Sequence, residues 1–394
     1  MTRKNIPVCL CCDLNYLRYA CVTLASVAYT SSEPVDFYIL HSGISKELQN
    51  IVVNWMKSRF PKDSLTFLDI SRQLSLINVR QVRHFNALVF GRYFIPQLLP
   101  GAHKAIYLDS DTIVLDDIAA LGGAALGGAA LGGAALGGIY EYWQDNNDWG
   151  EKIKNDLEYL NLSGTHKYFS SGVLLLDCDK WRQENITQRL LDLYQKYREI
   201  TQYPDQDPLN KLFENNYKEL DAKFNVTEQT IISYKGTELL DLKNAVVVRH
   251  FAGDNKPWNQ VYLYSDANGK DCSDNFNDWW FFAGMTPFYD AISNDFLEKQ
   301  MKDFKSYEIP RLIGLSRTNV ICQEEFVSFV RSSRSCRYVL FGFVPLLKIK
   351  TKKNGKKVIY KLFGSLPVLG IKRKKNRSVY LLFGFLPLLS VMRK

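Results

Sequence analysis

The first 110 residues alternate between short apolar runs and longer segments with helical spacing, and this alternation restricts the fold most strongly. The apolar runs, each expected to be a strand, cover residues 6–12, 35–40, 65–70 and 104–108. Helical spacing of apolar side chains covers residues 16–29 and 45–59. Strands that alternate with helices are typical of a parallel sheet with helices on its faces. The sequence therefore predicts an α/β fold.

The second half of the chain continues with mixed elements. Strands are expected over residues 168–177 and 246–250, and helices over residues 181–198 and 288–307. We divide the chain into a catalytic domain (1–285), a helical connector (286–330) and a basic C-terminal tail (331–394).

Residues 119–138 are four perfect copies of Ala-Ala-Leu-Gly-Gly. Glycine pairs that recur every five residues fit neither the helical nor the strand period, and glycine costs backbone entropy in both structures. We therefore expect a flexible surface loop, with a short helix broken by glycine as the alternative. Exact repetition also indicates slippage at the DNA level, so we expect related strains to differ in copy number.

Charge is distributed unevenly along the chain. Residues 331–394 contain 17 Lys and Arg and no Asp or Glu, so from a net charge of +9 the preceding 330 residues carry −8. Aromatic and leucine-rich blocks begin at Tyr338, Tyr360 and Tyr380, and lysine-rich spacers separate them. This pattern favours insertion into the headgroup layer of an anionic membrane. The alternatives are a β-rich extension packed on the body and a nucleic-acid-binding tail, and we expect no nucleic acid.

The eight cysteines include no CxxC pair with metal-ligand spacing, and three of them crowd into the apolar run of residues 8–12. Reduced, buried thiols of this kind are typical of a cytoplasmic protein. The apolar run near the N-terminus is too short for a secretory signal, and no stretch reaches the ~20 apolar residues that span a bilayer. We expect a cytoplasmic protein held peripherally on the inner face of the cytoplasmic membrane.

Two carboxylates, Asp109 and Asp111, directly follow the predicted strand over residues 104–108. Ligands of open α/β sheets bind beyond the carboxyl ends of strands. Hard oxygen ligands suit Mg²⁺ or Mn²⁺, which bridge protein carboxylates to substrate phosphates and neutralise the charge on a departing diphosphate. A solvated turn at the end of the strand is the alternative.

His250 ends another predicted strand and begins the sequence His-Phe-Ala-Gly-Asp-Asn-Lys-Pro-Trp. Imidazole is a suitable third ligand for Mn²⁺ beside two carboxylates. Gly253 would let the backbone approach a phosphate closely, and Lys256 would supply a positive charge to a phosphate oxygen. A purely structural histidine is the alternative.

Carboxylate and amide groups also gather at Asp205, Gln206 and Asp207, where a helix is expected to begin. The functional interpretation is that Asp205 and Gln206 contact a polar substrate. A helix N-cap is the alternative role for Asp205.

Taken in this order, the motifs resemble the family-8 glycosyltransferases, retaining enzymes that include lipopolysaccharide galactosyl- and glucosyltransferases. The resemblance extends over residues 7–258. It rests on residues 12–16, 40–45, 107–111, 169–173, 180–182, 205–207 and 250–258. It implies a nucleotide-diphospho-sugar transferase (GT-A-like) fold, with a mixed, mostly parallel sheet flanked by helices, here followed by a basic amphipathic tail.

The resemblance also implies roles for individual residues. Asp109, Asp111 and His250 match the ligands of Mn²⁺ (or Mg²⁺). Asp205 and Gln206 match the catalytic positions beside the donor sugar, where Gln206 would stabilise an oxocarbenium-like state. The donor-binding positions, from the uridine to the diphosphate, are Asp13, Asn15, Tyr16, His84, Arg92, Ser110, Gly253 and Lys256. Arg92 is expected to clamp an anion.

The chain departs from the family pattern in two places. Ser170 stands where the family often has Asn, and a hydroxyl has one fewer donor than an amide. The pentapeptide array replaces the stretch that usually supplies an acidic sugar contact, and Glu141 is our candidate for that contact.

The implied activity is the transfer of galactose or glucose from a UDP-sugar to a lipopolysaccharide, lipooligosaccharide or similar glycan on a lipid in bacteria. A self-glycosylating or donor-hydrolysing relative and a non-catalytic glycan-binding scaffold are the alternatives.

Overall fold

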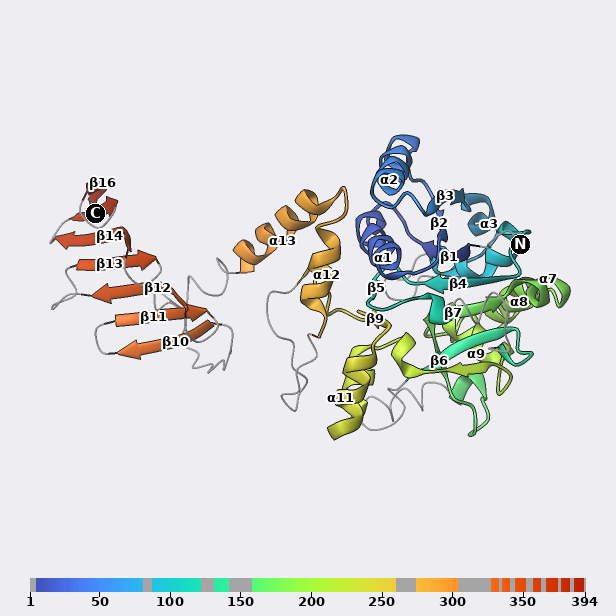
Figure 1. Cartoon of the computed structure of the whole chain (residues 1–394). Helices are drawn as coiled ribbons and strands as arrows, with labels where there is room; N and C mark the ends of the chain where they lie inside the picture. Colours follow the sequence, from blue (N-terminus) through green and yellow to red (C-terminus); the bar gives the residue numbers. More distant parts are fainter. Residues whose placement is uncertain are drawn as a thin grey trace. The chain divides into compact units, whose positions relative to one another are not determined.

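The computed structural model describes residues 5–80, 87–121, 131–141, 158–259 and 274–303, together with a set of strands between residues 327 and 392. The chain divides into two compact units, Met1–Asp303 and Phe304–Lys394 (Figure 1). The predicted connector of residues 286–330 thus begins inside the first unit.

A seven-stranded mixed sheet forms the centre of the first unit, in the order β3-β2-β1-β4-β7-β6-β8. Its strands are β1 (Ile6–Cys11), β2 (Val35–His41), β3 (Ser64–Asp69), β4 (Lys104–Leu108), β6 (Leu136–Tyr140), β7 (Phe169–Asp177) and β8 (Lys218–Leu220). Strands β3, β2, β1 and β4 are mutually parallel, and β6 is parallel to β8. Only the pairings of β7 with β4 and β6 within this sheet are antiparallel. The predicted α/β fold with a mostly parallel sheet is confirmed.

Helices cover both faces of this sheet, which explains why its central strands β1, β4 and β7 are buried on both sides. In β2, Phe37 and Ile39 pack with α1 (Leu17–Thr30) and α2 (Lys46–Arg59). Leu40 of the same strand packs into the core on the opposite face. That second core also receives α3 (Ser71–Ser75), the 3₁₀-helix η1 (Ala87–Phe94), α4 (Ile95–Leu98), α7 (Cys178–Gln183), α8 (Ile186–Tyr197) and α9 (Gln206–Leu212).

The remaining elements of the first unit lie outside the main sheet. They are β5 (Thr112–Val114), η4 (Glu158–Leu160), η5 (Ala222–Phe224), α10 (Glu228–Ser233), α11 (Gly236–Ala245), β9 (Val248–His250), α12 (Phe276–Ala283) and α13 (Tyr289–Asp303). Strands β5 and β9 form a separate antiparallel pair. Trp279 and Phe282 of α12 pack against Val22 of α1.

The surface loop predicted over residues 119–138 is wrong at its C-terminal end. Residues 135–138 of the last pentapeptide copy are buried, and its Leu-Gly-Gly forms the first three residues of β6. Gly138 suits this position because a Cβ there would lie 2.8 Å from Cδ2 of Phe169. Pairing with β7 and close packing on Phe169 thus impose a strand on a sequence with no strand period. Residues 122–130 of the array lie outside the described residues.

The helix predicted over residues 181–198 is interrupted, and two helices, α7 and α8, occupy this range. Asn185 adopts φ +52° between them, in the left-handed region that asparagine tolerates better than most residues. The other predicted helices and strands of the first unit agree with the structure to within a few residues at each end, except that residues 304–307 of the last predicted helix lie outside the described residues.

The second unit is a seven-stranded antiparallel meander in sequence order. Its strands are β10 (Val327–Ser332), β11 (Ser335–Leu340), β12 (Val344–Thr351), β13 (Lys357–Leu362), β14 (Leu366–Lys374), β15 (Arg377–Leu382) and β16 (Leu386–Met392). Each copy of the aromatic–leucine template forms one hairpin.

The three hairpins share one register. In each, a bulge follows the template tyrosine, and the next residue pairs with a proline, namely Pro345, Pro367 or Pro387. Proline cannot donate to a strand ladder and is tolerated beside a bulge. The repeated proline is therefore compatible with a strand in all three copies.

Across the described residues, no helix is both long and apolar enough to cross a membrane.

Candidate active site

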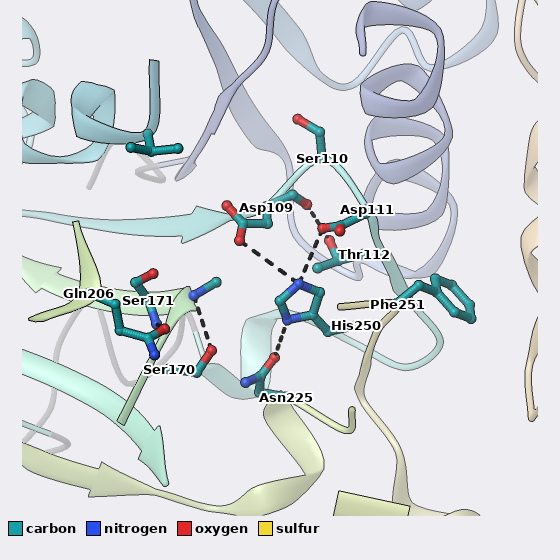
Figure 2. A network of polar contacts seen from close by, with 12 residues as sticks. Asp109, Ser110, Asp111, Thr112, Ser170, Ser171, Gln206, Asn225, His250 and Phe251 are labelled. Atoms are coloured by element: carbon teal, nitrogen blue, oxygen red, sulfur yellow. Dashed lines mark hydrogen bonds and ion pairs between the residues drawn. The ribbon is translucent and has the colours of Figure 1, made fainter. Parts of the chain in front are cut away.

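Pairing between β5 and β9 brings the two carboxylates and the histidine together. β4 ends at Leu108, Asp109 and Asp111 follow it, and Thr112 of β5 pairs with His250 of β9. His250 Nε2 lies 3.2 Å from Asp111 Oδ1 and 3.8 Å from Asp109 Oδ2 (Figure 2). The three ligand atoms fall within 4.8 Å of one another. The structure thus assembles the three predicted metal ligands at one point.

This group is suited to a divalent cation. Two carboxylate oxygens and one imidazole nitrogen form a donor set that accommodates Mn²⁺ or Mg²⁺. The space between them is kept open by Gly172, because a Cβ at that position would lie 2.3 Å from His250 Cε1 and 2.9 Å from Asp109 Oδ2.

Positive charge surrounds the two aspartates. Lys256 Nζ donates to Asp111 Oδ2 and to the carbonyl of Phe251. Although burial acts to raise the pKa of Asp111, the charges of Lys256 and His250 prevail and hold that pKa below its usual range. Burial acts to lower the pKa of His250, but the neighbouring Asp111 raises it on balance. Lys256 and His250 therefore oppose the negative charge of the two aspartates.

Arg92 is buried and connects two carboxylates. Its guanidinium lies 3.0 Å from Asp109 Oδ1 and 3.2 Å from Asp205 Oδ2, and it also donates to the carbonyls of Val89 and Ser171. The hydroxyl of Tyr107 reaches the same oxygen of Asp109 at 2.6 Å. Arg92, expected to clamp a substrate anion, is thus engaged by the protein's own carboxylates.

The start of α9 lies beside β7 and completes the network. Ser171 Oγ donates to Asp205 Oδ2 at 2.8 Å, and the Ser171 amide donates to Gln206 Oε1 at 2.8 Å. Asp205 occupies the N-cap position of α9 without a side-chain cap hydrogen bond. Burial raises the pKa of Asp205, and the charge of Arg92 opposes that rise. The carboxylate of Asp205 therefore serves the Arg92 network and not the helix end.

Ser170 and Glu141 approach the same region from β7 and from the end of β6. Ser170 is buried, and its Oγ accepts the Gly172 amide at 3.3 Å. Burial raises the pKa of Glu141, opposed by the charge of His250 and a hydrogen bond from Ser170. Glu141 thus lies close enough to sense both Ser170 and His250.

The residues before α1 form an exposed turn near the carboxylates. Asp13 Oδ1 accepts the Tyr16 amide at 2.9 Å, while Asn15 and Tyr16 are exposed. Burial of part of its ring and the charge of Asp111 raise the pKa of Tyr16. Tyr16 therefore lies within electrostatic reach of the Asp109–Asp111 pair.

The other predicted donor-binding residues differ in their placement. The Ser110 hydroxyl donates to the carbonyl of Cys11 at 2.8 Å and so fastens the turn to β1. Gly253 adopts φ +84°, which favours glycine, and lies in an exposed turn. His84 lies outside the described residues.

Sequence reasoning did not single out several residues of this network. Tyr107 and Gly172 lie inside predicted strands and within the stretches 107–111 and 169–173 that carry the family resemblance, but neither was given a role of its own. Asn225, whose Oδ1 lies 2.9 Å from His250 Nδ1, comes from a stretch with no motif of its own. Only the pairing of distant segments brings these residues to the site.

Residues 7–261 match the model of the family described as glycosyl transferase family 8. The chain belongs to this family. Among its relatives, glycosyltransferase GlyE of Streptococcus pneumoniae is 26% identical over 322 residues, which are 79% of this chain and 69% of GlyE. General stress protein A of Bacillus subtilis is 24% identical over 263 residues, which are 63% of this chain and 86% of that protein.

Solved structures agree with the family assignment at the level of the fold. The galactosyltransferase LgtC, in complex with donor and acceptor sugar analogues, superposes with a TM-score of 0.56 at 23% identity, covering 72% of this chain and 96% of LgtC. The apo form of GlyE gives a TM-score of 0.52 at 24% identity, covering 75% of this chain and 64% of GlyE. The chain is a family-8 glycosyltransferase with the fold of nucleotide-sugar transferases.

Proposed function

We propose that the chain is a metal-dependent retaining hexosyltransferase that moves galactose or glucose from a UDP-sugar to a lipopolysaccharide, lipooligosaccharide or similar cell-surface glycan. The observation that carries this proposal is the convergence of Asp109, Asp111 and His250 beyond the end of β4. When bound there, Mn²⁺ or Mg²⁺ would supply neutralisation of the charge on the departing diphosphate.

Lys256 is the residue that we assign to the diphosphate. Its ammonium is ion-paired with Asp111 and buried. A cation on Asp111 would repel this ammonium, which would then be free to pair with a phosphate oxygen. Gly253, which has a positive φ, lies in the turn before Lys256 and places no side chain there. Asp13, Asn15 and Tyr16 would bind the uridine.

Asp205, Gln206, Ser170 and Glu141 are the residues that we assign to the donor sugar. The Ser171 amide holds the Gln206 carbonyl oxygen, and Arg92 holds Asp205. These fixed polar groups suit the stabilisation of positive charge that develops on a sugar ring, because they need little reorganisation. Gln206 would stabilise this charge and not attack the sugar.

We also propose that residues 331–394 hold the enzyme on the inner face of the cytoplasmic membrane, where a lipid-linked acceptor would lie. The strand register pairs Arg337 with Lys348, and Lys348 with Lys361. These paired positions are basic in sequence, and a basic segment is attracted to an anionic membrane surface. Attachment to the acceptor's membrane would raise the effective concentration of enzyme.

The membrane proposal is tested on the full chain with vesicles of phosphatidylglycerol and of phosphatidylcholine. Binding to the anionic vesicles that weakens with salt, and weakens again when Lys348, Lys350, Lys361 and Lys372 are changed to Gln, would support it. Equal binding of the native and substituted chains would contradict it. Binding to RNA in preference to either vesicle would favour a nucleic-acid tail instead.

The catalytic proposal is tested by UDP release from a panel of UDP-sugars with Mn²⁺, with and without EDTA. The native chain is compared with Asp111→Asn and with Asp116→Asn, an exposed aspartate after β5 that serves as the control. Release from one UDP-hexose that EDTA and Asp111→Asn abolish, and Asp116→Asn retains, would support the metal-dependent donor site.

Other outcomes of this assay separate the alternatives. Labelled sugar on the protein itself would indicate self-glycosylation, and release that no glycan acceptor accelerates would indicate donor hydrolysis. A folded chain that releases UDP from no donor, even with lipooligosaccharide present, would contradict the proposal and favour the glycan-binding scaffold.

A further inference from the structure

We propose that Asn225 is a positioning residue for the metal site. It fixes the tautomer and the orientation of His250, so that the electron pair on Nε2 faces Asp109 and Asp111. This inference rests on the proposed metal-dependent function and adds a residue to which no role was assigned from the sequence.

The contact lies on the far side of the imidazole ring from the carboxylates. Asn225 Oδ1 is 2.9 Å from His250 Nδ1, whereas His250 Nε2 is 3.2 Å from Asp111 Oδ1. Figure 2 shows the two aspartates and the asparagine at opposite ends of the ring. Because an amide oxygen only accepts hydrogen bonds, Nδ1 carries the proton in this contact. A neutral ring then has its electron pair on Nε2, the nitrogen that a cation would bind.

Paired backbone holds the amide against the ring. The residue after Asn225 bonds to β9 on both sides: the Val226 amide donates to Val248 O at 2.9 Å, and the His250 amide donates to Val226 O at 3.0 Å. The Asn225 amide itself donates to Ala222 O at 3.0 Å. Asn225 and His250 therefore keep their relative position without help from a ligand.

A buried arginine reinforces the same connection. Arg249 Nη1 donates to Val226 O at 2.7 Å and to His250 O at 2.9 Å, so it joins the carbonyls that flank the contact. Asn225 is 2% exposed and His250 is 5% exposed. Water has little access to Nδ1 and cannot readily replace the amide oxygen. Loss of Asn225 would thus leave the ring free to change tautomer or to rotate.

The energetic consequence follows from the behaviour of histidine ligands in general. A ligating histidine whose second nitrogen donates to a fixed acceptor is pre-oriented, and loss of such a partner typically weakens metal binding about 10- to 100-fold. Asn225 touches neither the substrate nor the reacting atoms in this scheme. Its effect is expected on metal affinity first, and on turnover only through the metal.

The first experiment measures Mn²⁺ affinity of the full chain by the electron paramagnetic resonance signal of free Mn²⁺, without donor or acceptor. Asn225→Leu keeps the size but removes the acceptor, and we expect about 10- to 100-fold weaker binding. Asn225→Asp keeps an acceptor oxygen, so we expect affinity within a few-fold of the native chain. Thr230→Val removes the hydrogen bonds of the Thr230 hydroxyl, which accepts the Thr227 amide in the α10 capping box and donates to the backbone carbonyl of Asn225. It leaves the Asn225 side chain in place and so controls for local destabilisation.

The second experiment reads the tautomer without any metal. Histidine is labelled with ¹⁵N, and the His250 signals are assigned with His250→Gln. At high pH, we expect a proton on Nδ1 in the native chain and in Thr230→Val, and a shift towards Nε2 in Asn225→Leu. A native His250 with its proton on Nε2 would overturn the inference, because the amide group would then be donating.

The controls separate failure of this inference from failure of the proposed function. If the native chain binds Mn²⁺, Asp111→Asn does not, and Asn225→Leu binds as the native chain does, then only the role of Asn225 is wrong. If the native chain and Asp111→Asn are equally unable to bind Mn²⁺, both proposals are overturned. If Thr230→Val loses as much affinity as Asn225→Leu, the effect is one of local stability and the inference fails.

Discussion

Gly172 lies directly against the imidazole of His250. A Cβ at position 172 would be 2.3 Å from His250 Cε1, well inside the 3.0 Å below which something must shift. The backbone of Gly172 is itself fixed, because its carbonyl accepts the Asp109 amide at 2.8 Å. The ring of His250 and the turn after β4 can therefore approach each other only because residue 172 has no side chain.

Substitution of this glycine is expected to damage the site more than the fold. In Gly172→Ala the imidazole must move away from Asp109, so we expect Mn²⁺ affinity and UDP release to fall at least about tenfold. Overpacking at this position is expected to lower the free energy of unfolding by about 1 to 3 kcal/mol. Gly164→Ala is the matched control, because a Cβ there meets no atom within 4 Å. Native Mn²⁺ affinity in Gly172→Ala would contradict the geometry of the site.

Arg92 offers a prediction about stability. Its guanidinium pairs with Asp109 and Asp205, and Arg92→Met would leave both buried or half-buried carboxylates without this partner. Removing one partner of a buried ion pair typically costs about 3 to 5 kcal/mol. We expect that loss in urea unfolding, and a partial recovery when Asp205→Asn is added, because one uncompensated charge disappears. A loss of under about 1 kcal/mol in Arg92→Met would show that the pair is not needed.

Much of this site could be predicted because its chemistry lies in residue types at strand ends. Asp109, Asp111 and His250 each follow or end an apolar run, and ligands of α/β sheets bind beyond the carboxyl ends of strands. The convergence of His250 with the two aspartates comes from the β5–β9 pair, which is separate from the main sheet. Asn225 and Gly172 could not be predicted in this way. Their roles arise from the pairing of β5 with β9 and of β4 with β7, which are far apart in sequence.

The structure of the pentapeptide array could not be predicted from its sequence, because its four copies are identical. Nothing in Ala-Ala-Leu-Gly-Gly distinguishes the last copy, yet it supplies the start of β6 in the buried sheet. The distinction comes from the neighbours, Phe169 and Leu175 of β7 and Leu220 of β8, which meet the last two glycines. A period read from sequence cannot show which copy a sheet will recruit.

The two glycines of the last copy are expected to differ in their response to a methyl group. A Cβ at Gly138 would lie 2.8 to 3.2 Å from Cδ2, Cγ and Cβ of Phe169, a rigid group packed in the core. At Gly137 the two nearest atoms are the ends of Leu220 and Leu131, at 3.0 and 3.1 Å. We expect Gly138→Ala to cost about 1 to 3 kcal/mol and Gly137→Ala less, as measured by urea unfolding. The reverse order would show that β6 is packed differently.

Asp207, in the first turn of α9, is buried and fully engaged by the protein. Its Oδ1 accepts the Tyr168 hydroxyl at 2.5 Å, and its Oδ2 accepts the Tyr159 hydroxyl and the amides of Gln202 and Tyr203. Even so, burial raises its pKa to about 6 from the ordinary 3.8. The folded protein therefore holds a proton at Asp207 over a pH range in which the unfolded chain has lost it.

This raised pKa fixes the direction of a pH effect on stability. Because the folded state binds the extra proton, the contribution of Asp207 is greatest at low pH and is lost as the pH rises through 6. Asp207→Asn does not titrate, so the difference in unfolding free energy between the native chain and this variant isolates the effect from other groups. We expect that difference to shift by about 1.4 kcal/mol in favour of the native chain between pH 8 and pH 5. If the difference in unfolding free energy is constant with pH, or favours the native chain more at pH 8, the prediction is wrong. The carboxylate of Asp207 would then be ionised in the folded protein at pH 5, because its four hydrogen bonds outweigh the cost of burial.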